Sequence, residues 1–270
     1  MVAQLHDIME TMIPSLRGLR PHARRVVAGH RPVTLGVIAA LIAICQLAIL
    51  AGPATAAPVP TGVPASQELV VLLAAADAHR APEATSPQME VVQARRPITG
   101  EETTLPVLSL RIGLGGVRWL LVMLPGRPNG STGWIPQLDN RLIATPWRIK
   151  VDLAARRVSV YRDGRLTRVF EAVVGKPSTP TPSGRFFVEE SVQMAPGQAG
   201  APFALALSAR SNALQEFEGG PGQIAIHGRE NIGGTVGRAE SHGCIRLATA
   251  SIDWLAERIR PGTPVTIEAA

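Results

Sequence analysis

The dipeptide Asp163-Gly164 strongly constrains how this chain can fold. It separates two runs of β-type residues, 157–162 and 165–174. Both residues of a two-residue type I′ turn take positive φ, which Asp and Gly tolerate, so we predict a β-hairpin. Similar runs bounded by Gly and Pro predict strands at 107–112, 119–124, 147–152, 185–192, 203–207, 224–227 and 265–267. One short helix is expected at 251–260, before Pro261-Gly262. We therefore predict a mainly β protein.

A second helical pattern precedes these strands. Ser66 is a suitable N-cap, and apolar residues follow it at helical spacing up to Arg80. We predict a helix over 66–80, within a region 67–145 that continues as a small β module. Residues 53–66 are rich in Pro and Ala and short of large side chains, as expected for a semi-rigid linker.

The N-terminal residues have the order of an export sequence. Residues 1–32 contain five arginines and predict a basic cytoplasmic n-region. Residues 33–52 are predicted to form a hydrophobic helix that is either the h-region of a signal peptide, cut after Ala56, or a membrane anchor. In both cases the positive-inside rule sends the remainder outside the cytoplasm. We expect a protein of the cell wall or periplasmic space, secreted or held in the membrane through residues 33–52.

The basic composition does not favour a nucleic-acid partner. The chain has a formal net charge of +6 and a pI near 10.5. The charges beyond the N-terminal arginines are interspersed rather than gathered in a stripe, so no nucleic acid is expected.

Cys244 is the one thiol in the exported part, because Cys45 lies within the hydrophobic run. A cysteine attacks as thiolate and needs a nearby base or a positive field. His227 ends a strand-like run, and a glycine-rich return over 230–237 can bring it beside Cys244. His242 is two residues from Cys244, a fixed spacing that favours a supporting role. Gly243 allows a turn, and its backbone N–H is a candidate oxyanion donor.

These residues resemble a known family. His227-Gly228 followed by Ser241-His242-Gly243-Cys244-Ile245-Arg246 is similar to the signature of the L,D-transpeptidase catalytic domain, the YkuD family. The segment 174–186 resembles a cleft-wall segment of that family. The resemblance covers about 147–267 and implies a predominantly β sandwich, so we take 146–268 as the catalytic domain.

The resemblance implies a role for each matched residue. Cys244 would be the nucleophile, His227 the general base, and Gly228 the carbonyl that orients His227. His242 would support the site, with Gly243 supplying an oxyanion N–H. Substrate contacts would come from four residues: Ser241, Arg246, Thr181 and Pro182. Family members often carry Asn in place of Arg246 and Ser in place of Gly228, which leaves open whether Arg246 meets a substrate carboxylate or packs against the histidines.

The implied reaction uses no cofactor and no metal. Cys244 would attack a peptidoglycan tetrapeptide stem, release D-Ala and hold the donor as a thioester. An amine of a second stem then gives a 3→3 cross-link, whereas water gives L,D-carboxypeptidase activity. The same thiolate is expected to be acylated by carbapenem β-lactams.

Two other functions are compatible with the residues. His227, His242 and Cys244 could supply three zinc ligands, although the sequence suggests no fourth. The region 119–136 resembles bacterial SH3-like modules through Trp119 and the Gly-Trp-Ile ending at Ile135. The chain could then be a non-catalytic cell-wall-binding protein, with the β module as its working part.

Overall fold

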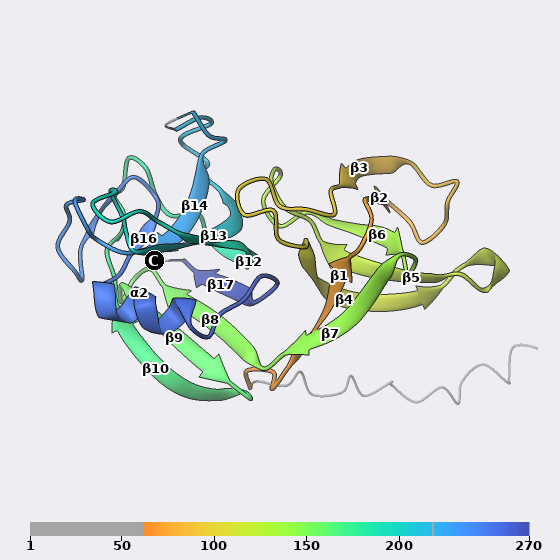
Figure 1. The fold of residues 1–270 in the computed structure, drawn as a ribbon, viewed down its shortest axis with the longest axis horizontal. Coiled ribbons are helices and arrows are strands. Elements are labelled where there is room, and N and C mark those ends of the chain that lie inside the picture. The colour runs from red at the N-terminus through yellow and green to blue at the C-terminus, as the bar shows by residue number, and fades with distance from the viewer. Residues whose placement is uncertain (1–61, 218, 270) are drawn as a thin grey trace, which may run out of the picture. The chain divides into compact units, whose positions relative to one another are not determined.

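The computed structural model describes residues 62–217 and 219–269. The predicted n-region, the hydrophobic segment 33–52 and most of the linker 53–66 lie outside these residues. Within the described part, no helix has the length and apolar character needed to cross a membrane. The strands belong to two large sheets and one small sheet, with one α-helix among the described residues, which agrees with the predicted mainly β class (Figure 1).

The N-terminal sheet contains the first seven strands in the order β3-β2-β6-β5-β4-β1-β7, with every neighbouring pair antiparallel. A short 3₁₀ turn, Leu114–Gly116, lies between β4 and β5. The resemblance of this region to SH3-like modules stays a prediction. The strands are β1 Gln67–Leu72, β2 Ala76–His79, β3 Gln88–Val92, β4 Thr104–Ile112, β5 Arg118–Met123, β6 Thr132–Pro136 and β7 Asn140–Thr145.

The predicted helix over 66–80 is wrong, because β1 and β2 occupy this segment. Strand β1 pairs on both sides, with β4 and with β7, and its residues Leu69 to Leu72 are all buried. A short apolar run fits a buried strand as well as a buried helix, and pairing with distant strands decides between them. Ser66 therefore caps no helix.

The C-terminal sheet has the order β10-β9-β8-β17-β12-β13-β14-β16. Strands β11 Val174–Gly175 and β15 Ala239–Ser241 form a separate parallel pair. Helix α2 spans Thr249–Ala256, within two residues of its predicted start. The sheet strands are β8 Trp147–Asp152, β9 Arg157–Arg162, β10 Arg165–Glu171, β12 Gly184–Gln193, β13 Phe203–Arg210, β14 Gln223–His227, β16 Ile245–Arg246 and β17 Pro264–Glu268.

The predicted hairpin at Asp163-Gly164 is confirmed. The two residues have φ of 51° and 74°, as a type I′ turn requires, and they join β9 to β10. The next strand pair continues the antiparallel order, with β9 beside β8. The hairpin therefore begins the sheet that, at its other edge, carries β14 and β16.

Strand β12 is buried on both faces. Phe186 packs into the core of the C-terminal sheet, and Phe187 packs into the core of the N-terminal sheet. Successive side chains of a strand point to opposite faces, so a single strand can contribute to two cores. The unbroken burial from Phe186 to Glu190 follows from this position.

Candidate active site

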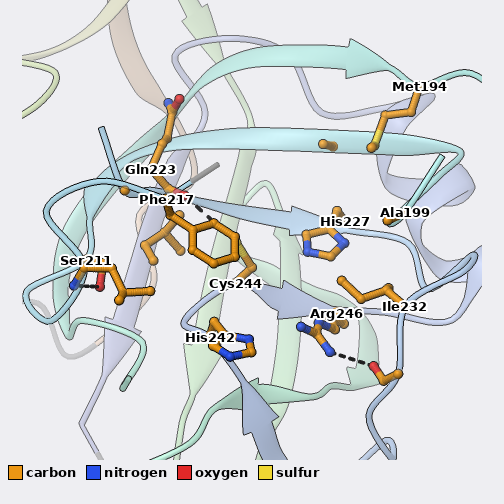
Figure 2. A pocket seen from close by; sticks show the side chains of 15 residues that line it. Met194, Ala199, Ser211, Phe217, Gln223, His227, Ile232, His242, Cys244 and Arg246 are labelled. Carbon is orange, nitrogen blue, oxygen red and sulfur yellow. Dashed lines mark hydrogen bonds between the residues drawn. The ribbon is translucent and has the colours of Figure 1, made fainter. Parts of the chain in front are cut away.

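Two short parallel strands bring His227 close to Cys244. Strand β14 pairs with β16 in the register Ile226 with Ile245 and His227 with Arg246. Cys244 directly precedes β16, so its backbone lies beside β14. His227 and Cys244 both line a cavity of about 530 Å³, and Figure 2 shows their side chains on the same side of the strands.

The imidazole of His227 is held in one orientation. Its Nδ1 lies 2.8 Å from the carbonyl oxygen of Gly228. A carbonyl can only accept, so Nδ1 carries the proton and the neutral ring keeps Nε2 as an acceptor. Burial lowers the pKa of His227 below 6.5, the Gly228 carbonyl opposes this, and the charge of Arg246 lowers it further. The ring is therefore neutral at neutral pH and suited to act as a base.

Cys244 is partly exposed in the same cavity. Its thiol donates to the carbonyl oxygen of Gln223, with 3.9 Å between sulfur and oxygen. Within the described part of the chain it forms no disulfide. The thiol thus meets the first residue of β14, the strand whose last residue is His227.

The turn before the cysteine is stabilised by Ser241. The Ser241 hydroxyl donates to the carbonyl of Cys244 at 2.6 Å and accepts the N–H of Gly243 at 3.1 Å. Gly243 has φ of +123°, a conformation that L side chains rarely adopt. The Gly243 N–H donates to the Ser241 hydroxyl in this structure, and its role as an oxyanion donor stays a prediction.

Three residues that were predicted to contact substrate lie outside the lining of the cavity. Ser241, Thr181 and Pro182 are buried and are not among the residues that line the cavity. The Thr181 hydroxyl donates to the carbonyl of Gly243 at 2.7 Å and accepts the N–H of Gly175 at 2.9 Å. These contacts fix the cysteine turn against the segment that follows β11. The direct contact of these residues with substrate stays a prediction.

His242 lies on the exposed side of the cavity. Its Nε2 is 3.3 Å from the Lys176 ammonium, and its ring stacks on Phe217 with 5.9 Å between centroids. A lysine ammonium has no acceptor, so His242 accepts through Nε2. This contact occupies the ring nitrogen of His242, whereas the Nε2 of His227 stays available. The geometry favours His227 over His242 as the base.

Arg246 brings a positive charge to the cavity. It is 7% exposed, and its Nη1 donates to the carbonyl of Gly233 at 2.6 Å. Burial lowers the pKa of Arg246, the Cys244 thiolate opposes this, and Arg229 lowers it further. No Asp or Glu of the described residues forms an ion pair with Arg246. The guanidinium can therefore interact with a thiolate or a substrate carboxylate.

Comparison with known proteins finds a family that is similar to the part of the chain that contains the cysteine site. Residues 146–267 match the YkuD family model, described as the L,D-transpeptidase catalytic domain. The YkuD match covers the C-terminal sheet and the whole cysteine site.

Individual proteins are also similar to this part of the chain. The YkuD protein of Bacillus subtilis (strain 168) is 28% identical over 146 residues, covering 54% of this chain and 73% of that protein. The YkuD protein of Bacillus licheniformis is 33% identical over 122 residues, covering 45% and 66%. The crystal structure of an Enterococcus faecium L,D-transpeptidase mutant aligns at 26% identity with a TM-score of 0.33. The alignment covers 45% of this chain and 49%, about half, of that one.

Several residues that line the cavity were not found from the sequence. They belong to segments with no catalytic motif, so their position depends on the fold. Gln223 and Ile224 lie close to a recognised motif, at the start of the strand that ends in His227. Others are apolar: Met194, Leu214, Phe217 and Ile232. No cluster of three or more His, Cys, Asp or Glu suited to a metal occurs in the described residues.

We predict that His227 makes the folded state acid-sensitive. Its pKa is lowered on folding, so as pH falls below 6.5 the unfolded chain binds more protons than the folded chain. The stability contributed by neutral His227 is present above this pH and is lost on acidification. The melting temperatures of wild type and His227→Asn, measured from about pH 7.5 to about pH 5, should converge towards acid. A constant difference across this range would contradict the prediction.

Gly228 is required by the close approach of another backbone segment. A Cβ at Gly228 would lie 1.9 Å from the carbonyl oxygen of Ala201. We expect Gly228→Ala to lower the free energy of unfolding by about 1–3 kcal/mol and to displace the His227 ring. The matched control is Gly233→Ala, where an added Cβ meets nothing within 4 Å. Urea denaturation should separate the two variants, and equal stabilities would refute this explanation.

Proposed function

We propose that this protein is an L,D-transpeptidase that acts through a Cys244 thioester. The observation that carries the proposal is the pairing of β14 with β16, which places Cys244 and His227 in one cavity. The bond from His227 Nδ1 to the Gly228 carbonyl leaves Nε2 as the acceptor for the thiol proton. The match of residues 146–267 to the L,D-transpeptidase catalytic domain supports this reaction class.

The first half-reaction forms the acyl-enzyme. His227 Nε2 takes the thiol proton, and the thiolate attacks the carbonyl carbon of the third residue of a tetrapeptide stem. The tetrahedral adduct collapses as the C–N bond to the terminal D-Ala breaks. The protonated His227 returns its proton to the leaving amine, so the products are free D-Ala and a Cys244 thioester.

The second half-reaction releases the enzyme. A side-chain amine of an acceptor stem attacks the thioester carbonyl, and the C–S bond breaks with the thiolate as leaving group. His227 accepts a proton from the attacking nitrogen. The product is a 3→3 amide cross-link, with the thiol restored once the proton returns from His227 to sulfur.

The cavity has the size and chemistry for such a donor. Its volume of about 530 Å³ lies within the usual range for ligand pockets. Apolar side chains such as Leu214 and Ile232 form part of its lining, and Arg246 adds the positive charge. Because peptidoglycan is outside the cytoplasm, we place the protein in the cell wall or periplasmic space.

A carbapenem adduct tests the thiol chemistry directly. The thiolate should open the β-lactam ring, so intact mass spectrometry should show one covalent adduct per wild-type chain. Cys244→Ala should show none, and His227→Ala should react at least about 100-fold more slowly because the general base is lost. His242→Ala is the matched control and should keep most of the rate. An unmodified wild-type mass would refute the enzyme proposal.

The products distinguish cross-linking from hydrolysis. Incubation with tetrapeptide muropeptides should give 3→3 dimers and free D-Ala, both absent with Cys244→Ala. Tripeptide monomers with no dimer would assign the protein as an L,D-carboxypeptidase of the same mechanism. Release of no D-Ala would contradict both.

We predict that Arg246 stabilises the thiolate of Cys244. Alkylation by iodoacetamide isolates this effect, since the reagent is neutral and has no carboxylate. Arg246→Gln should slow alkylation at neutral pH by about 10-fold, whereas Arg238→Gln, a control elsewhere in the domain, should not. An unchanged alkylation rate with slower tetrapeptide turnover would assign Arg246 to carboxylate recognition instead.

A further inference from the structure

One wall of the cysteine cavity is a connecting segment rather than a strand. Residues 211–222 join β13 to β14, and both Ser211 and Leu214 of this segment line the cavity. A long connection of this kind has few ladder hydrogen bonds of its own, so its position depends on contacts with other elements.

Arg127 of the N-terminal sheet holds this segment by its backbone. It lies between β5 and β6, and its Nη1 donates to the carbonyl of Pro221 at 2.8 Å. Its Nη2 donates to the carbonyl of Ser211 at 2.7 Å and to that of Leu214 at 3.3 Å. The planar guanidinium offers several fixed donors, so one side chain can join both ends of the segment.

Asn129, two residues further along the same turn, makes a matching contact. Its Nδ2 donates to the carbonyl of Arg210 at 2.8 Å, and its Oδ1 accepts the N–H of Arg210 at 2.8 Å. The amide thus pairs with the last residue of β13 as a neighbouring strand would. Arg127 and Asn129 together fix the point at which the cavity wall leaves the sheet.

The Arg127 contact is close to the nucleophile along the chain. Pro221, which accepts from Arg127, is followed by Gly222 and then Gln223, whose carbonyl accepts the thiol of Cys244. Gly222 packs closely against the same segment, because a Cβ there would lie 2.1 Å from the carbonyl oxygen of Leu214. A shift of the wall would therefore reach the start of β14, which borders the cavity.

A buried ion-pair network joins strands β12 and β13 to the segment between β3 and β4 of the N-terminal region. Glu189 of β12, 1% exposed, binds Arg96, which lies between β3 and β4, and Arg210 of β13. The side chain of Gln223 donates to Glu189 at 3.3 Å. Removing one member of a buried pair leaves an uncompensated charge and threatens folding, so Arg127, which is exposed, is the better residue to test.

We propose that Arg127 is a positioning residue for the cysteine site, through which the N-terminal sheet fixes the cavity wall formed by residues 211–217 and 219–222. The inference rests on the proposed function for its effect on turnover, but the contact itself can be tested independently. In this arrangement the N-terminal sheet shapes the donor cavity without touching the reacting atoms.

The test compares Arg127→Ala with Arg111→Ala in the full chain. Arg111 is an exposed arginine of β4 in the same sheet and serves as the matched control. Hydrogen–deuterium exchange of peptides covering 211–217 and 219–223 should become at least about 10-fold faster in Arg127→Ala only. Carbapenem acylation should slow by about 10-fold, while alkylation by iodoacetamide stays within about twofold because the thiol and His227 are intact. Arg127→Lys, which cannot bridge three carbonyls, should give intermediate values.

The outcomes are distinct. Unchanged exchange in Arg127→Ala would overturn the proposal, as would faster exchange with an unchanged acylation rate. A loss of iodoacetamide reactivity as large as the loss of acylation rate, together with a lower melting temperature, would show a general structural effect. That result would also overturn the proposal. If wild type forms no carbapenem adduct, the proposed function fails. In that case the position of the cavity wall is tested by the rate at which a bulky maleimide alkylates Cys244, divided by the rate for iodoacetamide. If this ratio is the same in Arg127→Ala and wild type, the positioning role is overturned.

Discussion

The cysteine site depends on the parallel pairing of two very short strands. Strand β16 has only Ile245 and Arg246, and it adds to the edge of the C-terminal sheet beside β14. Parallel strands need a crossover connection, and here the glycine-rich segment after His227 supplies it. Because the register is fixed by the buried Ile226 and Ile245, a slip of one residue would turn Cys244 away from the cavity.

The second constraint is the burial of β12 on both faces. Phe186 and Phe187 belong to different cores, so the two sheets cannot be packed independently of this strand. The same strand supplies Glu189, whose charge is stabilised by Arg96 and Arg210. The energetic link between the two sheets therefore contains apolar packing and a buried ionic contact, and it ends at Gln223 beside Cys244.

Local patterns predicted much of the fold. The Asp163-Gly164 turn and the strand runs were predictable because turn geometry and alternation are set by nearby residues. The segment 66–80 was not, since its apolar residues suit a helix and only pairing with β4 and β7 makes them a strand. Spacing and chemistry also pointed to Cys244 and His227 as members of one site, which the cavity agrees with.

The parts that sequence reasoning missed depend on contacts over long chain separations. The Thr181 hydroxyl donates to the Gly243 carbonyl, 62 residues away along the chain. The Gly243 N–H is bound by the side chain of Ser241, whose direction no local pattern specifies. Arg127 lies more than 80 residues from the segment it binds, and no motif marks it.

The charges around the cavity assign different tasks to neighbouring residues. His227 is kept neutral by burial, and the positive charge of Arg246 reinforces this. A neutral imidazole is a competent base but cannot itself stabilise a resting thiolate. Arg246 supplies that positive charge permanently, because a guanidinium stays protonated even when burial lowers its pKa. Under the proposed function, proton transfer and charge stabilisation would be carried by two residues that are paired across β14 and β16. An Asn at position 246 would keep the backbone pairing but lose the charge, so thiolate stabilisation would then fall to the imidazolium formed when His227 takes the proton.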